Sequence, residues 1–296
     1  MSAVLTLVVP CYNEAQRLPL DDFAQFLKAH PQVRICFVDD GSRDGTRGIL
    51  EEFSARFPRV AEVIALPQNK GKAEAVRAGM LRFLETPHGG EYAGFWDADL
   101  ATPLETSLRF LDVLEKDERT RCVIGSRSPK LGAKVERKPL RHFVGNAVAF
   151  VIRRYLGVPI YDTQCGAKIF CRAEVAELFN EPFVSRWLFD VEIFKRMTLC
   201  HSKAYPAEHV REMPLLEWRD VAGSKLKFYH GAKIMLELAR IALHYRGGFL
   251  RENGHSCPLN STKIATDRNV RSPLKKVVET EACSCDNVSS HENPHR

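Results

Sequence analysis

The first 126 residues alternate between short apolar runs and amphipathic segments, and this alternation limits the possible folds more than any other feature of the chain. Apolar runs of this length predict buried strands, and they occupy residues 4–9, 33–38, 60–66, 92–96 and 122–126. Segments with helical spacing of apolar residues lie between them, over residues 21–29, after Asp44, over residues 72–84 and from Pro103 onward. Strands that alternate with helices indicate an α/β domain, in which helices cover both faces of a mostly parallel sheet.

Acidic side chains follow two of these runs at the point where each predicted strand ends. Asp39 and Asp40 follow one run, and Asp97 and Asp99 follow another. The carboxyl ends of parallel strands meet at one edge of a sheet, where ligands collect. Carboxylates at positions i and i+2 can both face one divalent cation that is shared with substrate phosphates. We therefore expect a nucleoside-diphosphate site. Aspartates that merely end strands as turn formers are the alternative, which explains one such pair better than two.

The bulk properties of the chain set weaker limits. A net charge of +6 on 296 residues suits a phosphate-bearing substrate or an anionic membrane surface, and equally a protein with surplus lysines. No nucleic-acid partner is expected. The sequence contains no stretch long enough to cross a bilayer and opens directly on a strand, so we expect neither a membrane span nor a secretory signal. The nine cysteines form no zinc-type pair, which predicts reduced thiols in a cytoplasmic protein.

The second half of the chain is less regular. The pattern predicts helices over residues 139–156, 187–200 and 224–245, a strand over residues 161–170, and strand-like chain up to residue 216. The last of these helices is basic and amphipathic, with an apolar stripe that includes Ile234, Leu238 and Ile241. Such a helix either lies in a membrane interface or packs on the sheet with its basic face outward. Residues 247–296 are polar and lack periodicity, which predicts a disordered tail.

Several motifs occur in an order that resembles the family 2 inverting glycosyltransferases of GT-A fold. They are Val9-Pro-Cys-Tyr-Asn-Glu14, Val38-Asp-Asp-Gly-Ser-Arg-Asp-Gly-Thr46, Asn69-Lys-Gly71 and Asp97-Ala-Asp99. Later segments resemble the branch that acts on dolichyl or polyprenyl phosphate: Asp162-Thr-Gln-Cys-Gly-Ala-Lys168, Arg186-Trp-Leu-Phe-Asp-Val-Glu192 and Trp218-Arg-Asp-Val-Ala-Gly-Ser-Lys225. Within that branch, Thr163-Gln-Cys-Gly166 is more similar to the glucosyl type than to the mannosyl type.

The resemblance implies a GT-A (Rossmann-like) catalytic domain over residues 1–246, followed by the tail. Residues 1–127 would bind the nucleotide sugar, and residues 128–246 the acceptor. The implied reaction moves a hexose, glucose from UDP-glucose being favoured, onto a polyprenyl or dolichyl phosphate, with Mg²⁺ or Mn²⁺ as cofactor. The enzyme would be cytoplasmic and peripheral, at the cytosolic face of the membrane. The alternatives are mannosyl transfer from GDP-mannose, transfer to a soluble or polysaccharide hydroxyl, and an inactive nucleotide-binding module of the same fold.

The expected donor site combines three loops of the first half. The loop after the first strand offers Pro10, Tyr12 as a stacking face and Glu14 as an acceptor, and the resemblance assigns it to the nucleoside; a plain loop is the alternative. Either Asp39 or Asp40 would accept a hydrogen bond from the base or ribose, and the sequence does not decide between them. Lys70 precedes a predicted helix, where free N–H groups favour phosphate. A merely solvated lysine is the other interpretation.

The remaining site residues are predicted to bind the metal, the sugar or the acceptor. Asp97 and Asp99 would bind the metal. Some relatives have a polar third ligand where this chain has Ala101, so the third ligand stays open, with water as one candidate. A lipid phosphate is already anionic because its second pKa is about 6, so it needs cations more than a general base. Arg127, Arg141 and Lys225 are predicted to bind it. The resemblance places Asp162 and Gln164 in the sugar pocket, and it assigns Asp190 to sugar hydroxyls or acceptor arginines; a helix-face charge is the alternative for Asp190.

Overall fold

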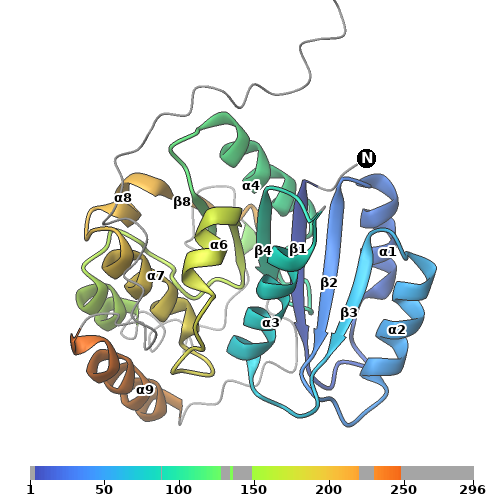
Figure 1. Ribbon diagram of the computed structural model, residues 1–296, viewed down its shortest axis with the longest axis horizontal. Helices are drawn as coiled ribbons and strands as arrows, with labels where there is room; N and C mark the ends of the chain where they lie inside the picture. Colours follow the sequence, from blue (N-terminus) through green and yellow to red (C-terminus); the bar gives the residue numbers. More distant parts are fainter. Residues whose placement is uncertain (1–3, 88, 128–133, 136–148, 220–229, 248–296) are drawn as a thin grey trace, which may run out of the picture. The chain divides into compact units, whose positions relative to one another are not determined.

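The computed structural model describes residues 4–87, 89–127, 134–135, 149–219 and 230–247 (Figure 1). All of them belong to the first of two compact units, residues 1–255. Arg141, Lys225 and the tail from residue 248 onward lie outside the described residues, so the predictions made for them stay predictions. Among the residues that the structure describes, no helix combines the length and the apolarity that a bilayer crossing requires.

A seven-stranded sheet forms the centre of the described unit, in the order β3-β2-β1-β4-β7-β5-β8. Its strands are β1 (Leu5–Cys11), β2 (Val33–Asp39), β3 (Ala61–Ala65), β4 (Tyr92–Trp96), β5 (Cys122–Ser126), β7 (Ala167–Cys171) and β8 (Val210–Pro214). The five strands predicted in the first half are confirmed, with ends that differ by at most two residues. The mostly parallel α/β fold is therefore confirmed as well.

Strand β7 departs from the parallel pattern. It runs antiparallel to both of its neighbours, β4 and β5. It is also shorter than the predicted strand over residues 161–170, because the chain from residue 161 to 166 forms a loop before the strand begins. This loop is anchored where the backbone N–H groups of Tyr161 and Asp162 donate to the carboxylate of Glu212 on β8, at 2.8 and 2.7 Å. Since β7 lies between β4 and β5, both halves of the chain share one sheet. A separate two-stranded sheet pairs β6 (Lys134–Val135) with β9 (Glu217–Trp218).

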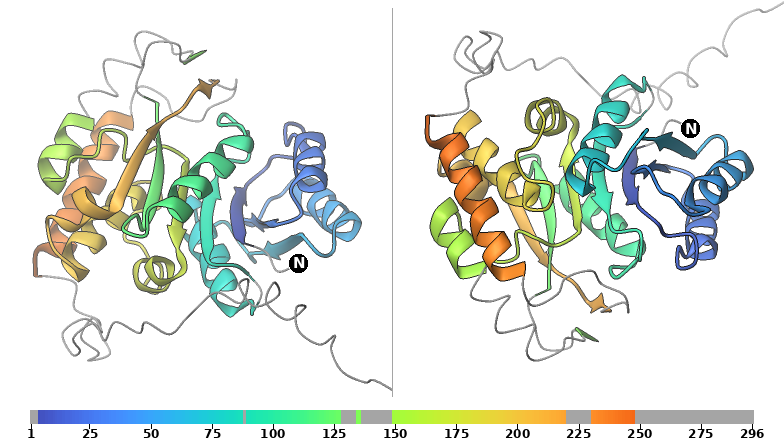
Figure 2. Two further views of the ribbon diagram at one scale, coloured as in Figure 1. Left: turned by 90° about the horizontal axis from the view of Figure 1, so that it is seen from above. Right: turned by 90° about the horizontal axis from the view of Figure 1, so that it is seen from below.

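Helices cover both faces of the sheet, as Figure 2 shows from two sides. The helices on one face are α1 (Leu20–Ala29), α2 (Thr46–Arg56) and α4 (Glu105–Lys116). The other face carries α3 (Lys72–Glu85), α6 (Arg172–Leu178), α7 (Phe189–Cys200) and α9 (His230–His244), with the helical residues 149–156. A short helix, α8 (Tyr205–His209), precedes β8. Alternation along β1 divides the core: Leu7 and Val9 face the first set, and Val8 faces the second.

The apolar stripe of helix α9 is buried inside the protein. Leu238 and Ile241 are buried in the same core cluster as Ile152 from residues 149–156, and the two helices lie side by side in Figure 2. Of the two alternatives for this stripe, packing on the protein is therefore the one observed. The 3₁₀ turn after α9, η1 (Tyr245–Gly247), brings the Tyr245 hydroxyl into contact with α7.

Buried polar groups on α7 hold that contact. The hydroxyl of Tyr245 donates to Glu192 Oε2 at 3.0 Å and accepts from Arg196 Nε at 2.9 Å. Glu192 also accepts from the backbone N–H groups of Val184 and Ser185, at 2.9 and 2.7 Å. Because each of these hydrogen bonds satisfies a group removed from water, the network fixes the loop before α7 and the end of α9 together.

Candidate active site

The carboxyl ends of β1, β2, β4 and β5 bring the predicted site residues to one edge of the sheet. Strand β1 pairs in parallel with β2 on one side and with β4 on the other. The loop after β1 therefore lies between Asp39, the last residue of β2, and Asp97, which follows β4. The convergence of strand ends expected from the sequence is present.

Asp97 and Asp99 occupy a tight turn directly after β4. The N–H of Leu100 donates to the Asp97 carbonyl at 3.2 Å, and the N–H of Ala101 donates to Asp99 Oδ1 at 3.1 Å. Leu100 has a φ of +48°, a left-handed conformation that costs a residue other than glycine about 1–2 kcal/mol. The indole N–H of Trp96 donates to the Thr102 carbonyl at 2.8 Å and anchors the other side of the turn. The surrounding contacts thus hold a strained turn that presents both carboxylates.

A lysine partly neutralises this acidic pair. Lys72, the first residue of α3, places its Nζ 2.5 Å from Asp97 Oδ1. Burial alone would lower the pKa of Lys72, but the carboxylates of Asp97 and Asp190 outweigh it and raise that pKa. Burial, with the charge of Asp97, raises the pKa of Asp99. Hard divalent metals prefer carboxylate oxygens as ligands. The neighbouring carboxylates of Asp97 and Asp99, which already attract the Lys72 ammonium, therefore fit Mg²⁺ or Mn²⁺.

Gly166 fixes where the Asp97 carboxylate lies. A Cβ atom added to Gly166 would stand 1.9 Å from Asp97 Oδ2 and 2.3 Å from its carboxyl carbon. Any side chain other than hydrogen would therefore displace the carboxylate. The loop before β7, which contains Gly166, is packed directly against Asp97, the residue that follows β4. Gly166 stands within a sequence motif, but the motif alone does not predict this role.

Asp40 and Asp39 have different environments. Asp40 accepts three hydrogen bonds from the loop before α3: from Lys70 N–H at 2.7 Å, Gly71 N–H at 2.8 Å and Asn69 Nδ2 at 2.9 Å. Burial raises the pKa of Asp40 in spite of these bonds. Asp39 is also buried, and its carboxylate accepts one hydrogen bond among the described residues, from the N–H of Ser42 at 3.2 Å.

Arg186 binds the same loop from the other side. Its Nε donates to the Lys70 carbonyl at 2.8 Å, and its guanidinium donates to Asn69 Oδ1 at 2.8 Å. Gly71, with a φ of +97°, passes so close to Arg186 that an added Cβ would meet Nε at 2.7 Å. The loop at the N-terminus of α3 is thus shaped by Asp40 and Arg186 together. The sequence placed Arg186 in a motif without assigning this contact.

Arg127 and Asp162 form a partly buried ion pair. Arg127 Nε and a terminal nitrogen donate to the two Asp162 oxygens, each at 2.7 Å, and the Arg127 N–H adds a third bond at 3.0 Å. Burial would raise the pKa of Asp162, but the Arg127 guanidinium outweighs it and lowers that pKa. The sequence predicted separate roles for the two, acceptor phosphate and sugar pocket. The structure pairs them, and Gln164 lies half-buried in the same loop.

Asp190 lies in a second ion pair. Lys168 on β7 is 0% exposed, and its Nζ contacts Asp190 Oδ1 at 2.5 Å and the Cys165 carbonyl. The same ammonium lies 5.0 Å from the centre of the Phe95 ring. Asp190 is therefore bound to a cation at the first turn of α7 rather than standing as a solvated helix-face charge.

The loop after β1 is compact. Asn13 has a φ of +52°, and its side-chain oxygen accepts from the N–H of Arg43 at 2.9 Å. The carboxylate of Glu14 is buried and bound by Arg17, whose terminal nitrogen lies 2.6 Å from Oε1. Tyr12 and Pro10 are both half-buried. The proposed contacts of Pro10, Tyr12 and Glu14 with a nucleoside stay predictions.

Comparison with solved structures defines the fold class. Glucosyl-3-phosphoglycerate synthase from Mycobacterium tuberculosis, solved in complex with UDP, superimposes with a TM-score of 0.57 at 17% identity, over 81% of this chain and 80% of that one. A Pyrobaculum calidifontis mannosyltransferase in complex with GDP-Man and Mn²⁺ gives a TM-score of 0.54 at 19% identity, over 83% and 65% of the two chains. The fold is that of the GT-A glycosyltransferases.

Sequence comparison narrows the class. The model of the Glycosyl transferase family 2 matches residues 6–179. Dolichyl-phosphate β-glucosyltransferase of Trichomonas vaginalis is 34% identical over 258 residues, which cover 82% of this chain and 72% of that protein. The Saccharomyces cerevisiae protein of the same name is 31% identical, over 84% and 77% of the two chains. The chain belongs to glycosyl transferase family 2 and, within it, to the dolichyl-phosphate β-glucosyltransferases.

Proposed function

We propose that this enzyme transfers glucose from UDP-glucose to dolichyl phosphate, with inversion, to give a β-linked lipid phosphosugar. The name shared by the sequence relatives supports the sugar and the acceptor. UDP-glucose as the donor is supported by the glucosyl-type segment from Thr163 to Gly166 and by the Mycobacterium tuberculosis structure in complex with Mn²⁺ and UDP-glucose. The site at the carboxyl edge of the sheet supplies the groups that such a donor needs.

The ion pairs formed by the two carboxylates predicted near the sugar support a phosphate acceptor. A hydroxyl acceptor needs a general base within reach of its proton. Asp190 is bound to buried Lys168, and Asp162 is bound to Arg127. For either carboxylate to take a proton, an ion pair would have to break in a poorly solvated place. A phosphate acceptor is already anionic and needs no base, so these two ion pairs are the observation that carries the proposed lipid-phosphate acceptor.

Each residue of the donor site has its own proposed role. Asp39, whose carboxylate has fewer partners than that of Asp40, accepts from the nucleoside. The ammonium groups of Lys70 and Lys72 bind the diphosphate. The N–H groups of Lys70, Gly71 and Ala73 at the start of α3 already donate to Asp40 and to the Arg186 carbonyl, so they are not counted as phosphate donors. Mg²⁺ or Mn²⁺, held by Asp97 and Asp99, supplies Lewis-acid stabilisation of the leaving nucleoside diphosphate when bound. The acceptor phosphate oxygen attacks C1 of glucose from the opposite side, and the C1–oxygen bond to UDP breaks.

The donor is tested with labelled sugar nucleotides. The purified chain is incubated with dolichyl phosphate, Mg²⁺ or Mn²⁺, and either radiolabelled UDP-glucose or radiolabelled GDP-mannose, and the lipid is extracted into organic solvent. We expect label in the organic phase from UDP-glucose. Label from GDP-mannose in its place would overturn the glucosyl assignment. UDP binding without transfer from any donor would favour the inactive binding module.

The acceptor phosphate is expected to contact Arg141 and Lys225, which lie outside the described residues. Replacing either by Ala should raise the KM for dolichyl phosphate about tenfold, because a charge-assisted hydrogen bond is lost. Calorimetry with UDP should give unchanged affinity. Arg47→Ala, on the exposed face of α2, is the matched control and should leave both values unchanged. Lower UDP affinity with a normal acceptor KM would place Arg141 and Lys225 at the donor instead.

We also propose peripheral membrane attachment through the outer side of α9. Its inner stripe is buried, but Leu236, Met235 and Leu243 are exposed on the opposite side, Leu236 to 55%. Arg240 is exposed on the same helix, and such a face suits an anionic interface. Leu236→Asp should reduce co-sedimentation with anionic liposomes, and high salt should release the wild type. Leu216→Asp, at a site 54% exposed outside α9, is the control. Equal liposome binding by Leu236→Asp and wild type would refute this attachment surface.

A further inference from the structure

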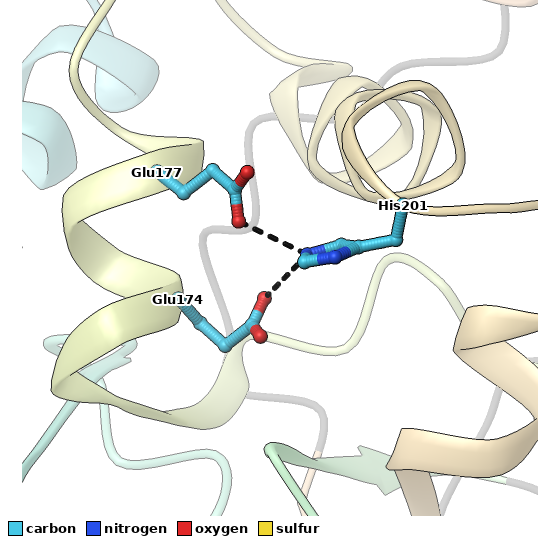
Figure 3. A group of neighbouring side chains, drawn as sticks. All are labelled: Glu174, Glu177 and His201. Atoms are coloured by element: carbon cyan, nitrogen blue, oxygen red, sulfur yellow. Dashed lines mark ion pairs between the residues drawn. The ribbon is translucent and has the colours of Figure 1, made fainter. Parts of the chain in front are cut away.

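A cluster of three metal-ligating side chains lies outside the donor and acceptor residues described above. Glu174 and Glu177 stand one turn apart on α6, and His201 directly follows α7 (Figure 3). Both carboxylates point from α6 toward the imidazole. His201 Nε2 lies 3.0 Å from Glu177 Oε2 and 4.0 Å from Glu174 Oε2. One ligand atom from each of the three residues can be chosen so that all lie within 4.8 Å of one another.

The buried carboxylate of Glu174 is incompletely satisfied. Glu174 is 3% exposed. Its Oε1 accepts from the Tyr205 hydroxyl at 2.6 Å, but its Oε2 has no hydrogen-bond partner among the described residues. The Nε2 of His201 forms an ion pair with Glu177 Oε2, at 3.0 Å. Burial raises the pKa of Glu174. The Tyr205 hydroxyl and His201 lower that pKa, but their effect is smaller than that of burial. An unpartnered buried carboxylate oxygen that faces a ring nitrogen is a place where a cation would be stabilised.

We propose that Glu174, Glu177 and His201 bind one zinc ion, with water as the fourth ligand. Three protein ligands drawn from imidazole and carboxylate, plus water, are a common zinc set. Bonds of about 2.0–2.2 Å place the ligand atoms of a tetrahedral site about 3.3 Å apart. The separations of 3.0 and 4.0 Å from His201 Nε2 to the two carboxylates bracket that value. Mg²⁺ prefers oxygen ligands alone, so the imidazole distinguishes this site from the Asp97 site.

Tyr205 orients two of the three ligands. Its hydroxyl fixes Glu174, and its ring stacks on the His201 imidazole with centroids 3.7 Å apart and planes inclined by 8°. Such outer contacts hold metal ligands in place. Because two ligands come from α6 and one from the residue after α7, a bound ion would connect these helices. The inference concerns stability, and it stands apart from the proposed transfer reaction.

Metal analysis of the full chain tests the site without any activity measurement. The protein is stripped with chelator, given excess Mg²⁺ to fill the Asp97 site, and dialysed against Zn²⁺. We expect wild type to retain one more zinc ion per chain than His201→Gln, and its melting temperature to rise with Zn²⁺ while that of the variant does not. Glu208→Gln, an exposed acid on α8, is the control and should behave as wild type.

Cobalt substitution keeps the test decisive if His201→Gln fails to fold. Co²⁺ bound to wild type in excess Mg²⁺ should give the intense visible absorption of a four-coordinate site, and X-ray absorption should detect an imidazole nitrogen. Equal zinc content in wild type and His201→Gln, or only weak six-coordinate cobalt absorption, would overturn the proposal. The cluster would then be an ion pair between His201 and Glu177 alone.

Discussion

Asp99→Asn is expected to lower kcat for glucosyl transfer by a factor of at least about 10³, comparable to the loss of a principal electrostatic stabiliser of a transition state. The amide keeps the size of the side chain but removes the charge that is proposed to hold the metal. Kinetics at saturating UDP-glucose and dolichyl phosphate measure the effect. Asp112→Asn, on the exposed side of α4, is the matched control and should retain wild-type activity.

The melting temperature separates this loss from unfolding. Burial and the neighbouring charge of Asp97 raise the pKa of Asp99, so the charged form of Asp99 is destabilised in the folded protein. The neutral amide removes that repulsion, and the metal-free variant should melt at or slightly above the wild-type temperature. Transfer by Asp99→Asn that persists at the wild-type rate in excess chelator would refute metal dependence through this residue.

Gly166→Ala is expected to lower kcat about 100-fold, the scale of a misplacement of about 1 Å in a catalytic site. The added methyl group would stand 1.9 Å from Asp97 Oδ2, so the carboxylate must move away from its position beside Asp99. Steady-state kinetics and titration of Mn²⁺ activation measure the result. The concentration of Mn²⁺ that gives half-maximal activation should rise together with the fall in kcat.

Gly48→Ala is the control for this substitution. Gly48 lies within α2, and an added Cβ there meets no atom within 4 Å. Alanine in a helix is favoured over glycine by about 1 kcal/mol, so the control should be equally or more stable and fully active. If Gly166→Ala binds Mn²⁺ and turns over as wild type does, the loop before β7 does not position Asp97.

The strands of the first half were predictable because each is a short, mostly apolar run bounded by polar residues. Strand β7 was predicted too long, because the strand was taken to begin at residue 161, whereas the largely polar residues 161–166 form a loop anchored to Glu212. Its antiparallel direction depends on the return of the chain from distant residues, which local pattern does not encode. The stripe of α9 was compatible with a membrane or with the core, and only tertiary packing decides between them.

The site residues, like the strands, divide into those that the sequence pattern predicts and those that only tertiary contacts determine. The place of Asp97 and Asp99 at the carboxyl edge of the sheet was predictable, because the ends of parallel strands converge there. Lys72, Gly166 and Arg186 were missed, although Lys72 directly follows the Asn69-Lys-Gly71 motif and the other two stood within quoted motifs. Lys72 and Arg186 contact side chains that lie 25 and 117 residues away in the sequence. Gly166 matters because its backbone comes close to the Asp97 carboxylate. The sequence likewise gave no sign that Arg127 neutralises Asp162.

The acceptor tests the account most directly. The purified chain is given radiolabelled UDP-glucose and a divalent metal with either dolichyl phosphate or dolichol, which differ only in the phosphate. We predict label in the lipid phase with dolichyl phosphate and none with dolichol, and the labelled product should release glucose in mild acid. Equal transfer to dolichol, or transfer only to a soluble or polysaccharide hydroxyl, would contradict the phosphate acceptor and would require a base that the ion-paired Asp162 and Asp190 do not provide.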